Sequence, residues 1–138
     1  MTIYALSSGS GKSGIAVIRV SGPETRKVIK LLTNGSIPTP KLATLKKINK
    51  INTSEIIDEG IIIWFPAPQS YTGEDMAEFH VHGSTAVVKA IHSSISKIKN
   101  CRLAEPGEFT KIAFQNGKIN LLKAESISDL ISAETEMQ

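Results

Sequence analysis

The chain has 138 residues, of which 41% are hydrophobic and 21% charged, a composition typical of a globular protein rather than a disordered or fibrous one. Its one cysteine, Cys101, excludes a disulfide framework and a multi-cysteine zinc site within one chain. No apolar run is long enough to span a bilayer, and the first residues lack the basic and apolar regions of a signal peptide. We therefore expect a soluble, cytoplasmic protein with no membrane partner.

Charge is unevenly distributed along the chain. Residues 1–54 carry nine Lys or Arg and one acid, a net +8, and residues 55–138 carry seven bases and twelve acids, a net −5, so the sum is +3. A basic half is typical of a surface that faces a phosphate backbone or a charged cofactor, and also of a solvated lysine surface. Only two Tyr and one Trp are present, which argues against a stacking platform for single-stranded nucleic acid.

Hydrophobic periodicity and turn residues predict ten elements. Pro23 is expected in the first turn of the first helix and Ser84 at the N-terminal cap of the second. Residues 42–48 and 56–65 are expected to pair as a hairpin. In chain order the expected elements are strands 2–6 and 15–20, helix 21–32, strands 42–48, 56–65 and 76–82, helix 84–99, strand 101–104, and helices 108–115 and 121–133.

This order predicts an α+β fold, with a mixed β-sheet and helices packed on it. The last expected helix has an apolar face formed by Leu122, Ile127, Leu130 and Ile131, and little of the chain remains for it to pack against. We expect it to belong to a larger helical region or to contact a partner.

The glycine-rich segment 7–14, SSGSGKSG, invites comparison with a phosphate-binding P-loop. That motif needs Gly-x-x-x-x-Gly-Lys followed by Ser or Thr, and the position of its first glycine is occupied by Leu6. The segment is also followed by an expected strand, whereas a P-loop opens a helix. A glycine-rich loop near a ligand is therefore the better interpretation.

The strand over residues 76–82 places several polar side chains on one face, because side chains alternate along a strand. Met76, Glu78, His80 and His82 share that face. A carboxylate beside two imidazoles fits a metal site, and equally a solvated face or a polar ligand pocket. A metal site normally needs a third protein ligand. The remaining histidine of the chain, His92, is expected on a helix and is a poor candidate for that role.

Three single residues have alternative interpretations. Glu78 could accept two parallel hydrogen bonds from an amino-pyrimidinone edge, such as that of guanine or a pterin. Arg19 lies on an otherwise apolar strand, where it either forms a structural ion pair or recognises an anionic ligand. Cys101 lacks a nearby activating signature, which favours a small buried residue over a nucleophile.

Several segments together resemble one family closely. The quoted segments are IAVIRVSGP over 15–23, FPAPQSYTGED over 65–75, AEPGEFT over 104–110, AFQNGK over 113–118 and LLKAE over 121–125. They resemble the N-terminal domain of the MnmE (TrmE) family of tRNA modification GTPases, and the likeness runs from residue 2 to about residue 135. These motifs are long, in order and evenly spaced.

The resemblance implies a tetrahydrofolate-binding fold like that of aminomethyltransferases, over residues 1–118, which also forms a homodimer. Residues 119–138 would begin a helical domain into which the family inserts its GTPase domain. With a flavoprotein partner, MnmG (GidA), the family installs a 5-carboxymethylaminomethyl-type group on the wobble uridine of tRNA. A bound 5-formyl- or 5,10-methylene-tetrahydrofolate would supply the one-carbon unit.

The family's folate-contacting positions fall on Arg19, Glu78 and Lys118, each with the residue type that the family pattern expects. By this resemblance Glu78 would pair with the pterin edge, and Arg19 and Lys118 would face polar or anionic parts of the folate. No catalytic residue and no metal ligand is expected. A dimerisation domain without folate binding, and a basic RNA-binding module, are the alternatives.

The hydrolase activity of the family is not expected of this chain alone. The sequence has no correctly spaced Walker A motif and no guanine-recognising Asn-Lys-x-Asp motif. The GTP, Mg²⁺ and K⁺ of the full-length family protein would therefore not be bound here. The family's cysteine motif near the C-terminus is also absent, and Cys101 does not correspond to it.

Overall fold

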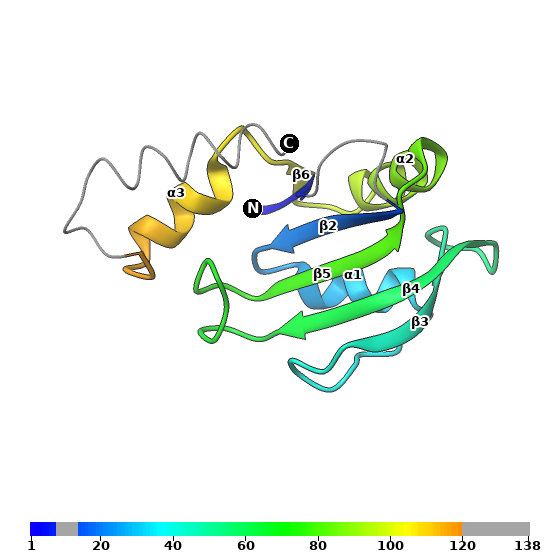
Figure 1. Ribbon diagram of the computed structural model, residues 1–138, viewed down its shortest axis with the longest axis horizontal. Coiled ribbons are helices and arrows are strands. Elements are labelled where there is room, and N and C mark those ends of the chain that lie inside the picture. The colour runs from blue at the N-terminus through cyan, green and yellow to red at the C-terminus, as the bar shows by residue number, and fades with distance from the viewer. Residues whose placement is uncertain (8–13, 120–138) are drawn as a thin grey trace.

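A computed structural model describes residues 1–7 and 14–119 (Figure 1). The elements in chain order are β1 (Thr2–Leu6), β2 (Ile15–Ser21), α1 (Thr25–Leu32), β3 (Thr44–Asn49), β4 (Ile56–Phe65), β5 (Met76–His82), α2 (Thr85–Ser96), β6 (Cys101–Leu103) and α3 (Glu108–Gln115). Nine of the expected elements are thus confirmed in order and type. The helix expected over residues 121–133 and most of the glycine-rich segment lie outside the described residues.

The strands form one six-stranded sheet in the order β3-β4-β5-β2-β1-β6. Every neighbouring pair is antiparallel except β1 with β6, which is parallel. The sheet is therefore mixed, and the α+β prediction is confirmed. The expected hairpin of β3 and β4 is also confirmed, with a register shift between Ile48 and Asn49.

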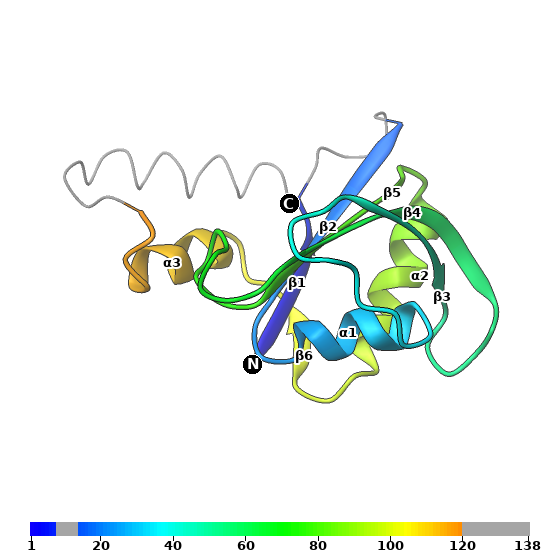
Figure 2. The same cartoon turned by 90° about the horizontal axis from the view of Figure 1, so that it is seen from below.

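Helices α1 and α2 cover one face of the sheet (Figure 2). Their apolar stripes enter the main core, where Val28, Ile29, Ile91 and Ile95 pack against strand residues such as Phe79. These side chains are fully buried, so this layer provides most of the apolar burial that stabilises the described part of the fold.

The opposite face of the sheet carries a second, smaller cluster. It contains Ile3, Ala5 and Met76 from the strands and Phe109 from α3. Helix α3 lies apart from α1 and α2 (Figures 1 and 2). A large part of this face is therefore not covered by any helix within the described residues, and we call it the open face.

Two helix boundaries differ from the sequence-based expectation. Helix α1 begins at Thr25 because β2 continues through Ser21 and Gly22 adopts a φ of 136°. A Cβ on Gly22 would lie 2.6 Å from the Cα of Thr2, so a glycine is required there. Helix α2 ends at Ser96 rather than Lys99, while its expected cap is confirmed, since Ser84 Oγ accepts a 3.1 Å hydrogen bond from the backbone N–H of Val87.

No helix within residues 1–7 and 14–119 combines the length and the apolar composition that crossing a bilayer requires.

Candidate functional site

The register of the central strands brings Arg19 and Glu78 together on the open face. Strands β2 and β5 run antiparallel, and these two residues occupy directly opposite positions. Both are partly buried, between fully buried residues that face the main core. Opposite positions in an antiparallel pair hold their Cβ atoms within about 5.5 Å. The structure therefore places two of the three predicted site residues side by side.

The guanidinium of Arg19 lies between two aromatic rings. Its Cζ is 5.1 Å from the ring centroid of Tyr71 and 5.4 Å from that of Phe109. Its Nε is buried and has no hydrogen-bond partner. Within the described part of the chain Arg19 also makes no ion pair, so the structural ion-pair interpretation has no support among these residues. A cation held by ring faces with an unused donor is suited to recognising an acceptor group.

The side chain of Glu78 contacts His80 on the same strand. His80 Nε2 lies 2.9 Å from Glu78 Oε1, and the two side chains are 31% and 26% exposed. One carboxylate oxygen is therefore held by the imidazole, and no hydrogen bond to the second is found among the described residues. This contact fixes the orientation of the Glu78 carboxylate on the open face.

His82 does not join this pair. Its Nδ1 and backbone N–H each lie 2.8 Å from an oxygen of Asp58 on β4. Burial raises the pKa of Asp58, but the hydrogen bonds from His82, a backbone hydrogen bond from Glu59 and the charge of His82 together lower the pKa below its usual value. Residues 1–7 and 14–119 contain no group of three or more His, Cys, Asp or Glu able to hold a metal ion.

The segment between β4 and β5 holds Tyr71 over Arg19. Ser21 Oγ, at the end of β2, lies 2.8 Å from Thr72 Oγ1 and donates a 2.9 Å hydrogen bond to Glu74 Oε1. The Tyr71 hydroxyl lies 3.0 Å from Thr110 Oγ1 on α3. Polar contacts that are half-buried or buried thus tie this loop to a strand on one side and to a helix on the other, which fixes the aromatic ring.

Helix α3 holds Phe109 on the other side of the guanidinium. Gly107, with a φ of 74°, turns the chain into the helix. Glu108 then accepts two hydrogen bonds from Arg102 at 2.8 and 2.6 Å, and a third from the backbone N–H of Glu105. The contact with Arg102 lowers the pKa of the Glu108 carboxyl. The two hydrogen bonds between Arg102 and Glu108 join β6 to α3 and help to keep the fully buried Phe109 in place.

Lys118, the third predicted residue, lies near the same loop but is exposed. Its Cγ is 3.4 Å from the position a Cβ would take on Gly73, and the side chain of neighbouring Asn116 donates to Thr72 O at 2.8 Å. The structure therefore places Lys118 at the rim of the loop that carries Tyr71. No contact joins it to Arg19 or Glu78 within the described residues.

An apolar hollow of about 450 Å³ adjoins the site on the open face. Its lining includes Ile61 and Ile63 of β4 and His80 of β5. Ile15 and Leu45, which also line it, are 58% and 61% exposed. The open face therefore combines charged groups with a patch of apolar surface.

Cys101 has the properties of a packing residue. It is half-buried against the main core. Burial raises the pKa of its thiol, and the nearby carboxylate of Glu24 adds to that effect. A protonated thiol is a poor nucleophile, which agrees with the interpretation from the sequence.

The sequence interpretation missed Tyr71, Phe109 and Asp58. Tyr71 and Phe109 lie within segments 65–75 and 104–110, so their presence in those motifs was the available signal. Their position around Arg19 depends on the tertiary packing of a loop and a helix. Asp58 shows no periodic or motif signal, and only the pairing of β4 with β5 reveals its contact with His82.

Comparison with known proteins gives consistent results. Residues 2–118 match the family described as GTP-binding protein TrmE N-terminus. The tRNA modification GTPase MnmE of Pelagibacter ubique is 78% identical over 138 residues, which are 100% of this chain and 31% of that protein. The mitochondrial 5-taurinomethyluridine-tRNA synthase subunit GTPB3 of Homo sapiens is 48% identical over 138 residues, 99% of this chain and 28% of that protein.

The fold and site describe an α+β domain with a candidate ligand site on the open face of its sheet. The chain belongs to the MnmE (TrmE) family of tRNA modification GTPases, and residues 2–118 are its N-terminal domain. The family resemblance found in the sequence is thereby confirmed. The chain spans less than a third of the length of these two relatives.

Proposed function

We propose that this chain is the folate-binding and dimerising N-terminal module of a tRNA modification GTPase. The observation that carries the proposal is the Arg19–Glu78 pair, in which a guanidinium with an unpartnered buried Nε stands opposite a half-buried carboxylate. Ring faces on both sides of Arg19 and an apolar hollow beside the pair supply the surroundings that an aromatic, charged ligand needs.

The residues present fit a tetrahydrofolate. Its pterin ring offers an amino-pyrimidinone edge with two donors, which matches the carboxylate that His80 orients on Glu78. Arg19, directly opposite Glu78, suits a polar acceptor group of the folate, and the exposed Lys118 suits its anionic glutamate tail. When bound, 5-formyl- or 5,10-methylene-tetrahydrofolate supplies a one-carbon unit. The protein groups named here bind and orient that ligand.

The apolar part of the open face supports the proposal of a homodimer. Ile15 and Leu45 expose large apolar side chains next to the hollow. Apolar area that is exposed in a single chain is commonly covered in a symmetric assembly. Sedimentation of the chain should show a dimer that Leu45→Glu converts to a monomer, and a monomeric unsubstituted chain at micromolar concentration would contradict this part of the proposal.

The role in the longer protein is proposed from the names of the relatives. They are tRNA modification GTPases and a 5-taurinomethyluridine-tRNA synthase subunit. We propose that this module acts in 5-carboxymethylaminomethyl-type modification of the wobble uridine in the cytoplasm. The full-length protein would use MnmG as flavoprotein partner and bind GTP, Mg²⁺ and K⁺ in its GTPase domain, and residues 119–138 would begin its helical domain.

Calorimetric titration with 5-formyltetrahydrofolate tests the folate site. Glu78→Gln and Arg19→Met should each weaken binding at least about tenfold, because each removes a charge-assisted contact. Lys118→Gln should have a smaller effect, since its charge is exposed and screened by solvent.

Arg26→Met and Glu55→Gln are the matched controls for this titration. Both residues are exposed, with Arg26 on α1 and Glu55 beside the turn that precedes β4, and both substitutions should leave folate affinity unchanged. Absence of binding by a folded, unsubstituted dimer would reject the folate site and leave dimerisation as the main role. Equal losses in the controls and in the site variants would reject the assignment of Arg19 and Glu78.

A further inference from the structure

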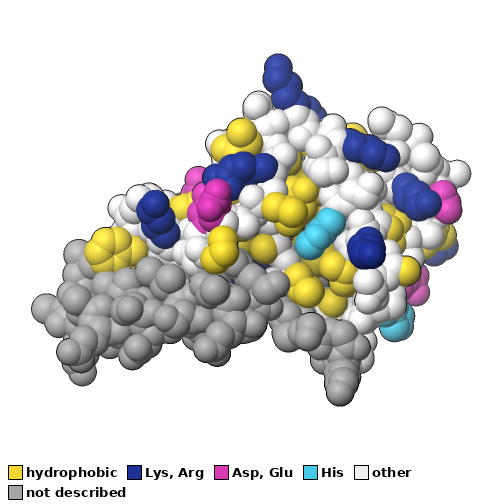
Figure 3. All heavy atoms as spheres, turned by 90° about the horizontal axis from the view of Figure 1, so that it is seen from above, with side chains coloured by type: hydrophobic (Ala, Val, Ile, Leu, Met, Phe, Trp, Pro, Cys, Tyr) yellow, Lys and Arg dark blue, Asp and Glu magenta, His cyan; other side chains and the backbone are white. Residues whose placement is uncertain are grey.

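The helical layer on the covered face has an outer surface without acidic side chains. Residues 25–32 and 85–99, which form α1, α2 and the end of its connection to β6, contain no Asp or Glu. Their basic residues, all exposed, are Arg26, Lys27, Lys30, Lys89, Lys97 and Lys99. None of these six makes an ion pair with any residue of 1–7 or 14–119. Figure 3, which views the molecule from above, shows Lys and Arg side chains spread over the face that it draws.

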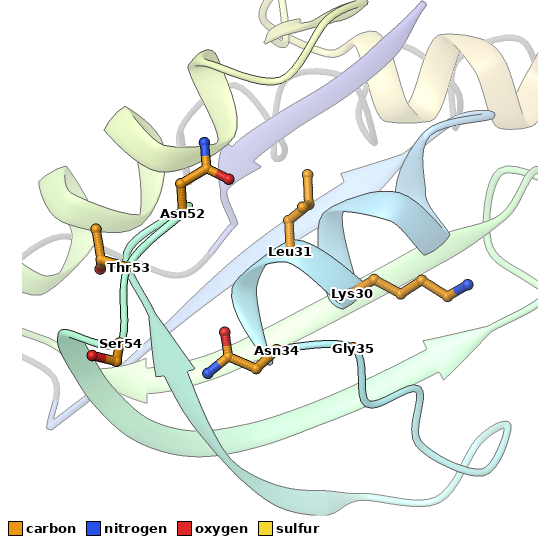
Figure 4. A pocket seen from close by; sticks show the side chains of 7 residues that line it. All are labelled: Lys30, Leu31, Asn34, Gly35, Asn52, Thr53 and Ser54. Atoms are coloured by element: carbon orange, nitrogen blue, oxygen red, sulfur yellow. The ribbon is translucent and has the colours of Figure 1, made fainter.

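One edge of this layer is hollowed. A pocket of about 550 Å³ lies between the end of α1 and the turn that joins β3 to β4. Figure 4 shows Asn34 at the end of α1 on one side and Asn52, Thr53 and Ser54 of that turn on the other, with the Lys30 side chain pointing away from the turn. A second hollow of about 490 Å³ shares Asn34 and Ser54 with the first and continues along β3.

The two hollows form one groove with a consistent chemistry, which we call the lysine groove. Most of its lining is polar and comprises three lysines, three asparagines, and serine and threonine hydroxyls: Lys30, Lys46, Lys47, Asn34, Asn49, Asn52, Thr33, Ser36, Thr53 and Ser54. Gly35 and the apolar side chains of Leu31, Leu45 and Ile56 also line it. Glu59 is the one acid that lines it, and the nearby Glu55 pairs with Lys50 at 3.2 Å. Lys46 donates a hydrogen bond to Ser36, which holds its ammonium inside the groove.

This set of groups matches a nucleic-acid backbone rather than its bases. Lysine ammonium groups, amides and hydroxyls are the usual donors to phosphate and sugar oxygens. The lining contains no aromatic side chain on which a base could stack. Amide groups can also contact the 2′-hydroxyl that distinguishes RNA from DNA.

We propose that the lysine groove, together with the basic surface of α1 beside it, binds the sugar-phosphate backbone of tRNA. The choice of tRNA rests on the proposed role in tRNA modification, whereas the preference for a phosphate backbone rests on the groove itself. The groove lies at the β3 edge of the sheet and shares Leu45 and Glu59 with the apolar hollow on the open face, whereas the Arg19–Glu78 pair lies on the central strands β2 and β5. The charged groups proposed for the RNA are thus different residues from those proposed for the small ligand.

The test measures fluorescence anisotropy of a labelled, unmodified tRNA transcript titrated with the 138-residue chain over a salt series. The double variant Lys30→Gln/Lys46→Gln should weaken binding at least about tenfold at low salt. It should also reduce the slope of log affinity against log salt by about 1.4 to 1.8, the value for two lost phosphate contacts. Because Lys46 bonds to Ser36, the variant Lys30→Gln/Lys47→Gln repeats the test with that hydrogen bond retained.

The matched control is Lys99→Gln/Lys111→Gln, which removes the same charge elsewhere. Lys99 precedes β6 at the opposite edge of the sheet, and Lys111 is exposed on α3. This control should change tRNA affinity less than about twofold. An equal loss in the control would show non-specific attraction to a basic protein and overturn the proposal, and so would absence of tRNA binding by the unsubstituted chain at low salt.

Titrating the same proteins with 5-formyltetrahydrofolate separates this inference from the proposed folate function. Groove variants that lose tRNA but keep folate support both. An unsubstituted chain that binds no folate, with groove variants that lose tRNA, counts against the folate site alone. Loss of both ligands in the groove variants, with an unchanged circular dichroism spectrum, would contradict different charged residues for the two ligands.

Discussion

The two faces of the sheet use the same strands for different purposes. On the covered face, Ile18, Phe79 and Val81 meet α1 and α2 in an apolar core that is almost completely buried. On the open face, the alternate positions of the same strands present Arg19 and Glu78. Since side chains alternate along a strand, one sequence of residues can specify a stabilising surface and a binding surface independently. Substitutions on each face should therefore have different consequences for stability and for binding.

The largest effect is expected for a truncation on the covered face. Phe79→Ala should lower the free energy of unfolding by about 3–5 kcal/mol, because Phe79 is fully buried and the space left behind refills only in part. Urea denaturation measures this. Leu103→Ala, at a side chain that is 56% exposed, is the control and should cost about 0.5 kcal/mol or less. Equal costs for the two would show that the covered face is not the main source of stability.

An intermediate effect is expected at the Arg102–Glu108 ion pair, which joins β6 to α3. Glu108→Gln should cost about 1 kcal/mol near neutral pH, a value reduced because Arg102 is 42% exposed. Arg102 lowers the pKa of Glu108 in the folded state. The stabilisation by the Glu108–Arg102 contact is therefore complete above the pKa that Glu108 has in the unfolded chain, and it is lost as pH falls through its lower pKa in the folded chain. Denaturation of both proteins at several pH values should show the difference shrinking below about pH 4.5. A difference that is constant with pH would contradict this assignment.

The contribution of Arg19 to stability should be smaller still. Arg19→Met removes two cation–π contacts, worth about 0.5–1 kcal/mol each, but also removes a buried Nε without a partner, which costs the fold a similar amount. The free energy of unfolding should therefore change by about 1 kcal/mol or less, while folate affinity falls at least about tenfold. A loss of stability as large as that of Phe79→Ala would make Arg19 a structural residue and break the comparison between the faces.

The sequence predicts the local parts of this arrangement well. Alternation over residues 76–82 places Glu78 and His80 on one face, and Ser84 marks the start of α2. Arg19 can be singled out without a structure, because burying an unpaired charge among apolar strand residues is costly. These signals are local because strand alternation and helix caps depend on residues only a few positions apart.

The rest of the site depends on contacts between distant segments. The pairing of Arg19 with Glu78 follows from the register of β2 and β5, which a hydrophobic pattern alone leaves open. The enclosure of Arg19 depends on Tyr71 and Phe109, which reach it from a loop and a helix far apart in the chain. The lysine groove similarly unites the end of α1 with the β3–β4 turn. The uneven distribution of charge along the sequence predicts a basic surface, but it does not predict where that surface forms a groove.

The smallest effect is expected from His92, a half-buried histidine on the helix-covered side. Its ring packs edge-on against Tyr4 with a centroid distance of 5.3 Å, and its Nε2 is buried without a hydrogen-bond partner. Burial lowers the pKa of this histidine in the folded state. In the unfolded chain the pKa of this side chain is about 6.5. Below that pH the unfolded chain binds a proton on His92 more readily than the folded chain does, so the free energy of unfolding falls as pH falls.

Substitution of this ring should remove that part of the pH dependence. Between about pH 7.5 and about pH 5.5 the unsubstituted chain should lose about 0.5–1 kcal/mol more stability than His92→Leu does. Because all other ionisable groups of the chain are the same in both proteins, only the difference between the two curves reports His92. Thermal unfolding at several pH values measures it, and parallel curves would mean that His92 accepts its proton in the folded state. A positive result would place the chain's acid sensitivity in this range on the covered face, away from the Arg19–Glu78 pair.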